Sequence, residues 1–322
     1  MRRISLMFIL FILLFNSIGN SQVKYPYPVK SITLSLNGID AKMAFMDVVS
    51  ANPNGRSLLL FHGKNFTGLY WKSVIDFFTK GGYRVIAPDQ IGWGVSSKPD
   101  MKYSFEMLAS NNRILLDSLH ITKVDVIGHS MGGMLATRFA LIYPERTSTI
   151  ILEDPLGMED YKKFVPFVSL DQTYKKEMSA TYASYKKYQE GYYPVWKPEY
   201  ELYVKAQAEA LKQKDFNSVA YVNALTYQMI YEDPVLYDFK KLTVPVLLVV
   251  GGVDKTIPNK QLLSKEQLKV HGNFASLAKK TRAQIKNCKV IILAGVGHIP
   301  HIQTSELFNM AVYSFFQEHQ DK

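Results

Sequence analysis

The sequence has little cysteine: Cys288 is the only one among its 322 residues. No intrachain disulfide can form, so a chain of this length must be stabilised by a hydrophobic core. Hydrophobic residues make up 47% of the chain and charged residues 20%, which excludes a disordered or collagen-like protein. The length allows one large core with an inserted subdomain.

The sequence also lacks an apolar run of the roughly 20 residues that a membrane span needs. The apolar run Ile4–Phe15 is shorter, follows Arg2 and Arg3, and precedes small and polar residues. This order is typical of a secretory signal peptide. We therefore predict that residues 1–21 are removed after Ser21 and that the mature protein is secreted or periplasmic, with an uncleaved anchor as the alternative.

Acidic residues are too few to balance the basic ones, and the formal net charge is +10. Most of the excess positive charge outside the signal peptide lies between Lys260 and Lys289. This segment contains seven lysines and Arg282 but only one acidic residue, Glu266. This segment predicts either weak contact with an anionic surface or a solvated helical face, and we favour the second. No nucleic-acid motif accompanies the charge, so we expect no nucleic-acid partner.

Short apolar stretches alternate with stretches of helical periodicity, and no internal repeat is visible. An antiparallel start followed by strand–helix repeats predicts an α/β fold with a mostly parallel sheet and helices on both faces. The expected strands are Ser31–Leu36, Lys42–Val48, Ser57–Phe61, Tyr83–Ala87, Lys123–Ile127, Thr149–Leu152, Val244–Val250 and Val290–Leu293. The expected helices are Tyr70–Lys80, Phe105–Leu119, Met131–Tyr143 and Thr304–Glu318.

The strand–helix rhythm breaks between Pro155 and Lys241. This segment favours helices, contains no buried-strand run and holds most of the tyrosines of the chain. We interpret residues 155–241 as a helical cap inserted into a core domain made of residues 22–154 and 242–322. The aromatic side chains of the cap are expected to line an apolar pocket or to form a small core of its own.

The strongest chemical signal is Gly128-His129-Ser130-Met131-Gly132, which lies between a predicted strand and a predicted helix. In that context the serine occupies a sharp, strained turn with its hydroxyl above the sheet. Small residues are needed two positions to either side, because a Cβ there would collide with the neighbouring strand and helix. The pattern predicts Ser130 as a nucleophile.

A serine hydroxyl needs a base, and the base needs an orienting carboxylate. His298 follows the predicted strand Val290–Leu293 and Asp254 follows Val244–Val250, so all three groups lie at carboxyl ends of strands, where open parallel sheets form their sites. Asp154 is the rival acid, although Asp154-Pro155 is more typical of a hinge. A metal pair of His298 and His301 lacks a nearby third ligand, so we predict no metal.

Acyl transfer also needs amide donors for the developing oxyanion. We predict the backbone N–H groups of Met131, which starts a helix, and of Lys64, which follows Gly63 in the loop after Ser57–Phe61. Asn65, His129 and Trp196 are expected to contact a small-molecule substrate. For the side chains of Lys64 and Asn65, loop solvation and turn hydrogen bonding are equally good explanations.

These motifs together resemble the capped α/β-hydrolase superfamily over roughly Ser31 to Gln317. The motifs that carry the resemblance are His62-Gly63, Asp89-Gln90-Ile91-Gly92-Trp93-Gly94-Val95-Ser96, Gly128-His129-Ser130-Met131-Gly132, Asp254 and Gly297-His298. They occur in the family order of nucleophile, acid and histidine. The resemblance implies an eight-stranded sheet, a cap between the sixth and seventh strands, and hydrolysis without a cofactor.

The resemblance is greatest to esterase-like enzymes and carbon–carbon-bond hydrolases. Dehalogenases and epoxide hydrolases have an aspartate where this chain has Ser130, so the sequence departs from both. The leading hypothesis is hydrolysis of a small to medium ester, thioester or lactone through an acyl-enzyme. A carbon–carbon-bond hydrolase, lyase or perhydrolase on the same triad, and a non-catalytic binding protein, are the alternatives.

Overall fold

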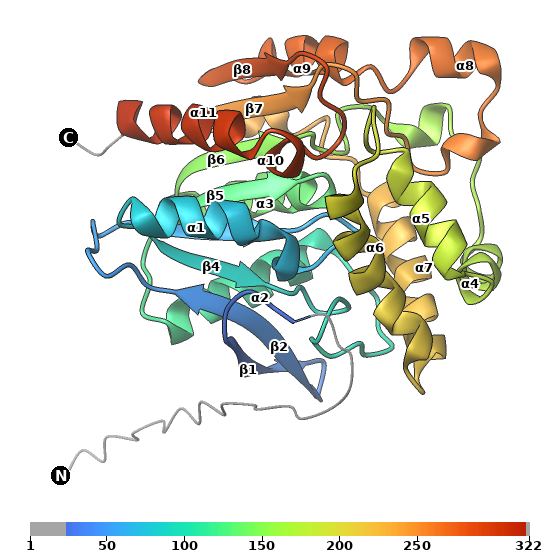
Figure 1. The fold of residues 1–322 in the computed structure, drawn as a ribbon, viewed down its shortest axis with the longest axis horizontal. Helices are drawn as coiled ribbons and strands as arrows, with labels where there is room; N and C mark the ends of the chain where they lie inside the picture. The colour runs from blue at the N-terminus through green and yellow to red at the C-terminus, as the bar shows by residue number, and fades with distance from the viewer. Residues whose placement is uncertain (1–23, 320–322) are drawn as a thin grey trace.

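The computed structural model describes residues 24–319, which contain an eight-stranded sheet in the order β1-β2-β4-β3-β5-β6-β7-β8 (Figure 1). The strands are β1 (Val29–Leu36), β2 (Ile39–Val48), β3 (Ser57–Phe61), β4 (Arg84–Pro88), β5 (Val124–His129), β6 (Thr147–Glu153), β7 (Val246–Gly251) and β8 (Cys288–Leu293). β2 pairs antiparallel with β1 and β4, and the other neighbouring strands pair in parallel. The predicted fold class is therefore confirmed. The predicted signal peptide, residues 1–21, lies outside the described residues.

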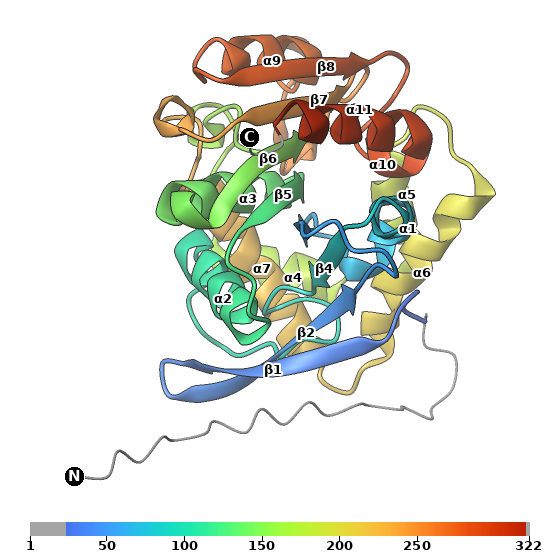
Figure 2. The same cartoon turned by 90° about the vertical axis from the view of Figure 1, so that its left-hand side faces the viewer.

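Helices cover both faces of the sheet because its central strands are apolar on both sides. On one face lie α2 (Phe105–Ser118), α3 (Met131–Ile142) and α9 (Phe274–Arg282), and on the other lie α1 (Lys72–Lys80), α10 (Pro300–Gln303) and α11 (Ser305–Glu318) (Figure 2). Each face has its own cluster of buried hydrophobic side chains. None of the helices within residues 24–319 is long and apolar enough to cross a membrane.

Two predicted helices differ from the structure at their ends. The stretch predicted as Tyr70–Lys80 begins with a 3-10 turn, Gly68–Trp71, because the Thr67 side chain accepts a hydrogen bond from the Leu69 amide before α1 starts. The stretch predicted as Thr304–Glu318 continues a short separate helix, α10, whose Pro300 occupies the first turn. The basic segment contains α8 (Lys265–Val270) as well as α9.

The segment between β6 and β7 is helical wherever it is regular. It contains α4 (Leu170–Met178), α5 (Tyr182–Glu190), α6 (Glu201–Ala208) and α7 (Phe216–Glu232). Figure 1 shows these four helices together beyond one end of the sheet, at its right-hand side. α4 packs on α7 and α5 packs on α6. This placement brings side chains of the inserted segment over the loops that follow β3, β5 and β7.

Candidate active site

A sharp turn between β5 and α3 carries Ser130. Its backbone has φ 56° and ψ −118°, a left-handed conformation that costs free energy in any residue except glycine. A Cβ on Gly128 would lie 2.1 Å from the carbonyl oxygen of Gly132, and a Cβ on Gly132 would lie 2.1 Å from that of Phe61. The two glycines therefore make room for a turn that places Ser130 just beyond the end of β5.

The structure brings the three side chains predicted as a triad together. His298 Nε2 lies 3.0 Å from Ser130 Oγ, and His298 Nδ1 lies 2.7 Å from Asp254 Oδ2. Ser130 follows β5, Asp254 follows β7 and His298 follows β8, so the carboxyl ends of three parallel strands supply the groups. Only 6%, 4% and 1% of the surfaces of Ser130, Asp254 and His298 are exposed. Because a carboxylate can only accept, Nδ1–H donates to Asp254 and Nε2 is left to accept the Ser130 proton.

Asp154, the rival acid in the sequence, lies against Asp254 rather than His298. Its carboxyl oxygens accept hydrogen bonds from the Gly251 amide at 3.0 and 3.1 Å. Burial and the charge of Asp254 raise the pKa of Asp154 well above its usual range. Burial also acts to raise the pKa of Asp254, but His298 and hydrogen bonds with Thr256 and Asp154 outweigh it and lower that pKa. A neutral Asp154 therefore donates to an ionised Asp254.

Asp154, Asp254 and His298 also offer three possible metal-ligand atoms within 4.8 Å of one another. The Nδ1 atom of His298 and one carboxylate oxygen of Asp254 are already hydrogen-bonded to each other, and the second carboxyl group is held neutral. A cation would need Nδ1 and both carboxyl groups free of protons. This donor set suits a hydrogen-bonded relay, and the absence of a metal stays a prediction.

The loop that carries His298 is held by contacts that the sequence did not indicate. The His298 amide donates to the Tyr192 carbonyl at 2.8 Å, and the Tyr192 ring stacks on the imidazole with centroids 5.0 Å apart. His301 donates from its amide to the Glu153 carboxylate at 2.8 Å. The His301 Nδ1 atom lies 2.9 Å from the same carboxylate. Both members of this pair are fully buried, and burial raises the pKa of Glu153 to about 7. The available signal in the sequence was an acidic residue, Glu153, directly after the apolar run Ile150–Leu152.

His129 belongs to the core and not to the substrate cavity, contrary to the prediction that it contacts substrate. It is fully buried, and its ring bridges two parts of the site. Nε2 lies 2.7 Å from the His298 carbonyl oxygen, and Nδ1 lies 3.0 Å from the Tyr70 hydroxyl, which in turn accepts from the Gly63 amide. The carbonyl can only accept, so Nε2 carries a proton, and the low pKa that burial gives His129 favours the neutral ring.

A buried neutral histidine makes the fold sensitive to acid. Burial lowers the pKa of His129 to about 3, outweighing the opposing effect of Glu153. Below about pH 6.5 the unfolded chain binds a proton at this site and the folded chain does not, so folding stability is lost as the pH falls from 6.5 toward 3. One such site contributes about 1.4 kcal/mol per pH unit near pH 5. We expect His129→Gln, which keeps a donor and an acceptor, to reduce the slope of unfolding free energy against pH by about this amount in urea titrations. Equal slopes for the two proteins would contradict this.

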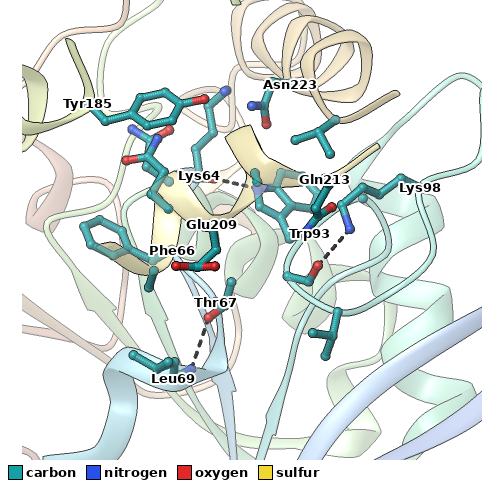
Figure 3. A pocket seen from close by; sticks show the side chains of 18 of the residues that line it. Lys64, Phe66, Thr67, Leu69, Trp93, Lys98, Tyr185, Glu209, Gln213 and Asn223 are labelled. Carbon is teal, nitrogen blue, oxygen red and sulfur yellow. Dashed lines mark hydrogen bonds between the residues drawn. The ribbon is translucent and has the colours of Figure 1, made fainter. Parts of the chain in front are cut away.

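A small cavity lies in front of Ser130. The centre of a water molecule can move within a volume of about 20 Å³ in this cavity, so the cavity has room for little more than one water. Lys64, Asn65 and Tyr227 are among its lining residues, and Lys64 is the only charged one in the part of the chain that the structure describes. Lys64 and Asn65 also line a larger neighbouring cavity of about 110 Å³ by the same measure, shown in Figure 3.

The two amides predicted as oxyanion donors lie in buried residues beside this cavity. Lys64 lines it, and Met131 follows Ser130 as the first residue of α3. In the part of the chain that the structure describes, neither amide donates to another residue. Buried amides in folded proteins almost always have a hydrogen-bond acceptor. Because these two amides have none among the described residues, each can donate to a ligand oxygen.

Of the other two residues predicted to contact substrate, Asn65 lies at the site and Trp196 does not. Asn65 lines both cavities and donates from Nδ2 to the Tyr192 hydroxyl at 2.9 Å. Trp196 does not line the cavity of Ser130. Its ring packs edge-on against Tyr193 and Tyr200, with Lys186 over one face, because it belongs to the packing of the inserted segment. The structure therefore does not bring Trp196 to the site.

A family model described as alpha/beta hydrolase fold matches residues 56–304. A crystal structure of a probable hydrolytic enzyme from Pseudomonas aeruginosa PAO1 is 40% identical in sequence, with a TM-score of 0.89, over 90% of this chain and 95% of that one.

Two curated relatives match over shorter regions. A 2-hydroxy-6-oxononadienedioate/2-hydroxy-6-oxononatrienedioate hydrolase from Burkholderia vietnamiensis is 34% identical over 143 residues, or 42% of this chain and 48% of the relative. Epoxide hydrolase 2 from Siraitia grosvenorii is 30% identical over 125 residues, or 38% of each chain. The chain spans less than half the length of both curated relatives.

Proposed function

Because the chain belongs to the alpha/beta hydrolase fold family, we propose that it is a serine hydrolase with Ser130 as nucleophile, His298 as base and Asp254 as orienting acid. One observation carries the proposal: a continuous hydrogen-bonded chain joins the hydroxyl, the imidazole and the carboxylate at 3.0 and 2.7 Å. This arrangement of groups performs acyl transfer on several unrelated folds.

In the first half of the reaction Ser130 Oγ attacks the substrate carbonyl carbon, and His298 Nε2 takes the hydroxyl proton. Asp254 stabilises the resulting imidazolium and holds its ring in place. The carbonyl oxygen becomes an oxyanion that accepts hydrogen bonds from the Met131 and Lys64 amides. When the tetrahedral intermediate collapses, His298 gives its proton to the leaving group and an ester to Ser130 remains.

In the second half a water molecule repeats the attack. His298 removes a proton from the water, the oxyanion forms again on the same two amides, and the acid product leaves as the proton returns to Ser130 Oγ. The step needs no group beyond the chain, the acyl-enzyme and water.

The proposed substrate is a small to medium ester, thioester or lactone, since apolar and tyrosine side chains dominate the lining of the cavity. A second candidate is cleavage of a carbon–carbon bond next to a carbonyl. It is favoured by the 34% identity to a curated relative named as a hydrolase of 2-hydroxy-6-oxononadienedioate. Both reactions use the same three residues.

Covalent labelling tests the nucleophile directly. We expect a fluorophosphonate probe to modify the native protein once, on the peptide that contains Ser130, as read by mass spectrometry. The Ser130→Ala variant and the heat-denatured wild type should stay unlabelled. Labelling at another serine, or none at all under conditions that label a control serine hydrolase, would contradict the proposal. Turnover of p-nitrophenyl esters, thioesters, lactones and vinylogous diketones then separates ester from carbon–carbon cleavage.

A further inference from the structure

Lys64 presents a buried cation beside the nucleophile. Only 7% of its surface is exposed, and its Nζ lies 4.0 Å from the centroid of the Tyr227 ring on α7. Figure 3 shows its side chain extending from the wall of the larger cavity toward Tyr185 and Asn223. Its backbone is fixed separately, because the Trp93 indole donates to the Lys64 carbonyl at 2.5 Å. The ammonium can therefore act independently of the proposed oxyanion amide of the same residue.

This ammonium has no anionic partner within residues 24–319. No carboxylate lies within 4.0 Å of it, and its Nζ makes no hydrogen bond to the described residues. The acid whose charge acts on it is Glu177 of α4, whose carboxylate instead accepts a hydrogen bond from Asn223 at 3.2 Å. A buried charge without a counter-ion costs free energy that a ligand of opposite charge recovers.

The Lys64 side chain still carries its charge at neutral pH. Burial lowers its pKa to about 8, with Lys176 acting in the same direction and Glu177 against it. Since about 8 lies above 7, the protonated form predominates. The face of the Tyr227 ring stabilises this ammonium less than a hydrogen-bonded carboxylate would. A carboxylate on a ligand would therefore stabilise the charge further.

The groups around Lys64 suit an anion. Tyr188, Tyr192 and Tyr227 line the cavity of Ser130 together with Lys64. Burial raises the pKa of each of these three hydroxyls, so they remain neutral hydrogen-bond donors. Among the described residues, no acidic residue lines this cavity, and Glu209, which lines the larger one, forms an ion pair with Lys212 at 2.8 Å. One ammonium beside a hydrogen-bonded cluster of neutral hydroxyls forms a site for a negatively charged group.

We propose that Lys64 recognises a carboxylate on the substrate, so that the enzyme acts on small anionic carbonyl compounds such as esters, thioesters or lactones that carry a carboxylate close to the scissile carbonyl. The inference rests on the proposed serine hydrolase function and names its substrate class. Lys64 and Asn65 line both cavities, so a substrate that extends from one into the other passes the ammonium.

Matched substrate pairs test this. One pair places the charge on the leaving group, 4-acetoxybenzoate against 4-acetoxybenzamide, and the other places it on the acyl group, phenyl 4-carboxybenzoate against phenyl 4-carbamoylbenzoate. We expect wild-type kcat/KM to favour the carboxylate at least tenfold in one pair. Lys64→Met should lower the ratio of kcat/KM for that carboxylate to kcat/KM for its amide 10- to 100-fold, as expected for loss of one charge-assisted contact. Lys64→Arg should keep the preference.

Lys98→Met is the matched control. Lys98 also lines the larger cavity, but its Nζ is satisfied by the Gly94 and Ser96 carbonyl oxygens at 2.7 and 3.1 Å. Its replacement should leave the carboxylate preference unchanged. No preference in the wild type, or a preference that survives Lys64→Met, would overturn the proposal, while turnover that still depends on Ser130 would leave the serine hydrolase function standing.

A binding measurement keeps the test independent of turnover. Calorimetric titration of Ser130→Ala with 4-acetoxybenzoate should show binding at least tenfold tighter than with 4-acetoxybenzamide, and adding Lys64→Met should remove the difference. Equal affinities in the single and double variants would overturn the carboxylate site even if none of the four esters were hydrolysed.

Discussion

Ser130→Ala is expected to lower kcat by about 10⁶, because no other group can form the covalent intermediate. Within residues 24–319, the Ser130 hydroxyl is the only group at hydrogen-bonding distance from His298 Nε2, so its removal leaves the base without a nucleophile to activate. The loss stops short of the uncatalysed rate, since the two amides and the cavity still bind the transition state and leave about 10³–10⁴ over water. Initial rates on the best ester of the panel provide the measurement.

Two controls make this result interpretable. The variant should unfold in urea at a midpoint close to that of the wild type, because the hydroxyl contacts only His298 among the described residues. Its residual activity should resist the fluorophosphonate probe, whereas traces of wild-type enzyme would be inactivated by it. Probe-resistant turnover above about one hundredth of the wild-type rate would exclude Ser130 as the nucleophile, since loss of a triad serine costs far more.

The turn at Ser130 was predictable because its causes are local. Gly128 and Gly132 lie only two positions to either side of Ser130, and the strand before and the helix after them have their own apolar periods. The three triad residues follow three different strands and still meet, because the carboxyl ends of parallel strands share one edge of a sheet. β3 begins and ends at the predicted residues for the same reason, as a short apolar run between turns.

The support of the site depends on contacts between distant parts of the chain and was not predictable. The Glu153 and His301 pair joins residues 148 apart, and a single sequence gives no indication of which buried acid meets which histidine. Trp196, His129 and Asn65 can all contact a substrate by their chemistry. In the structure, however, Trp196 packs within the inserted segment and His129 lies buried behind the nucleophile. Residue type alone did not separate the three.

The acid in the relay can be identified by replacing each aspartate in turn. Asp254→Asn is expected to lower kcat by about 10⁴, the size of the loss when a triad aspartate is replaced elsewhere. The reason is the tautomer: an amide at this position can donate to His298 Nδ1, which moves the imidazole proton to Nε2 and leaves no acceptor for Ser130. Initial rates should therefore fall while KM changes little.

Asp154→Asn should behave differently although the two residues touch. Burial and the charge of Asp254 raise the pKa of Asp154 well above its usual range, which favours its neutral form. Asparagine reproduces a neutral carboxyl group, because its oxygen can accept from the Gly251 amide and its NH₂ can donate to Asp254. We expect kcat within about tenfold of the wild type, because the charge-assisted hydrogen bond from His298 Nδ1–H to the Asp254 carboxylate is kept. A loss as large as that of Asp254→Asn would show that Asp154 carries the negative charge of the relay and that the acid has been assigned to the wrong strand end.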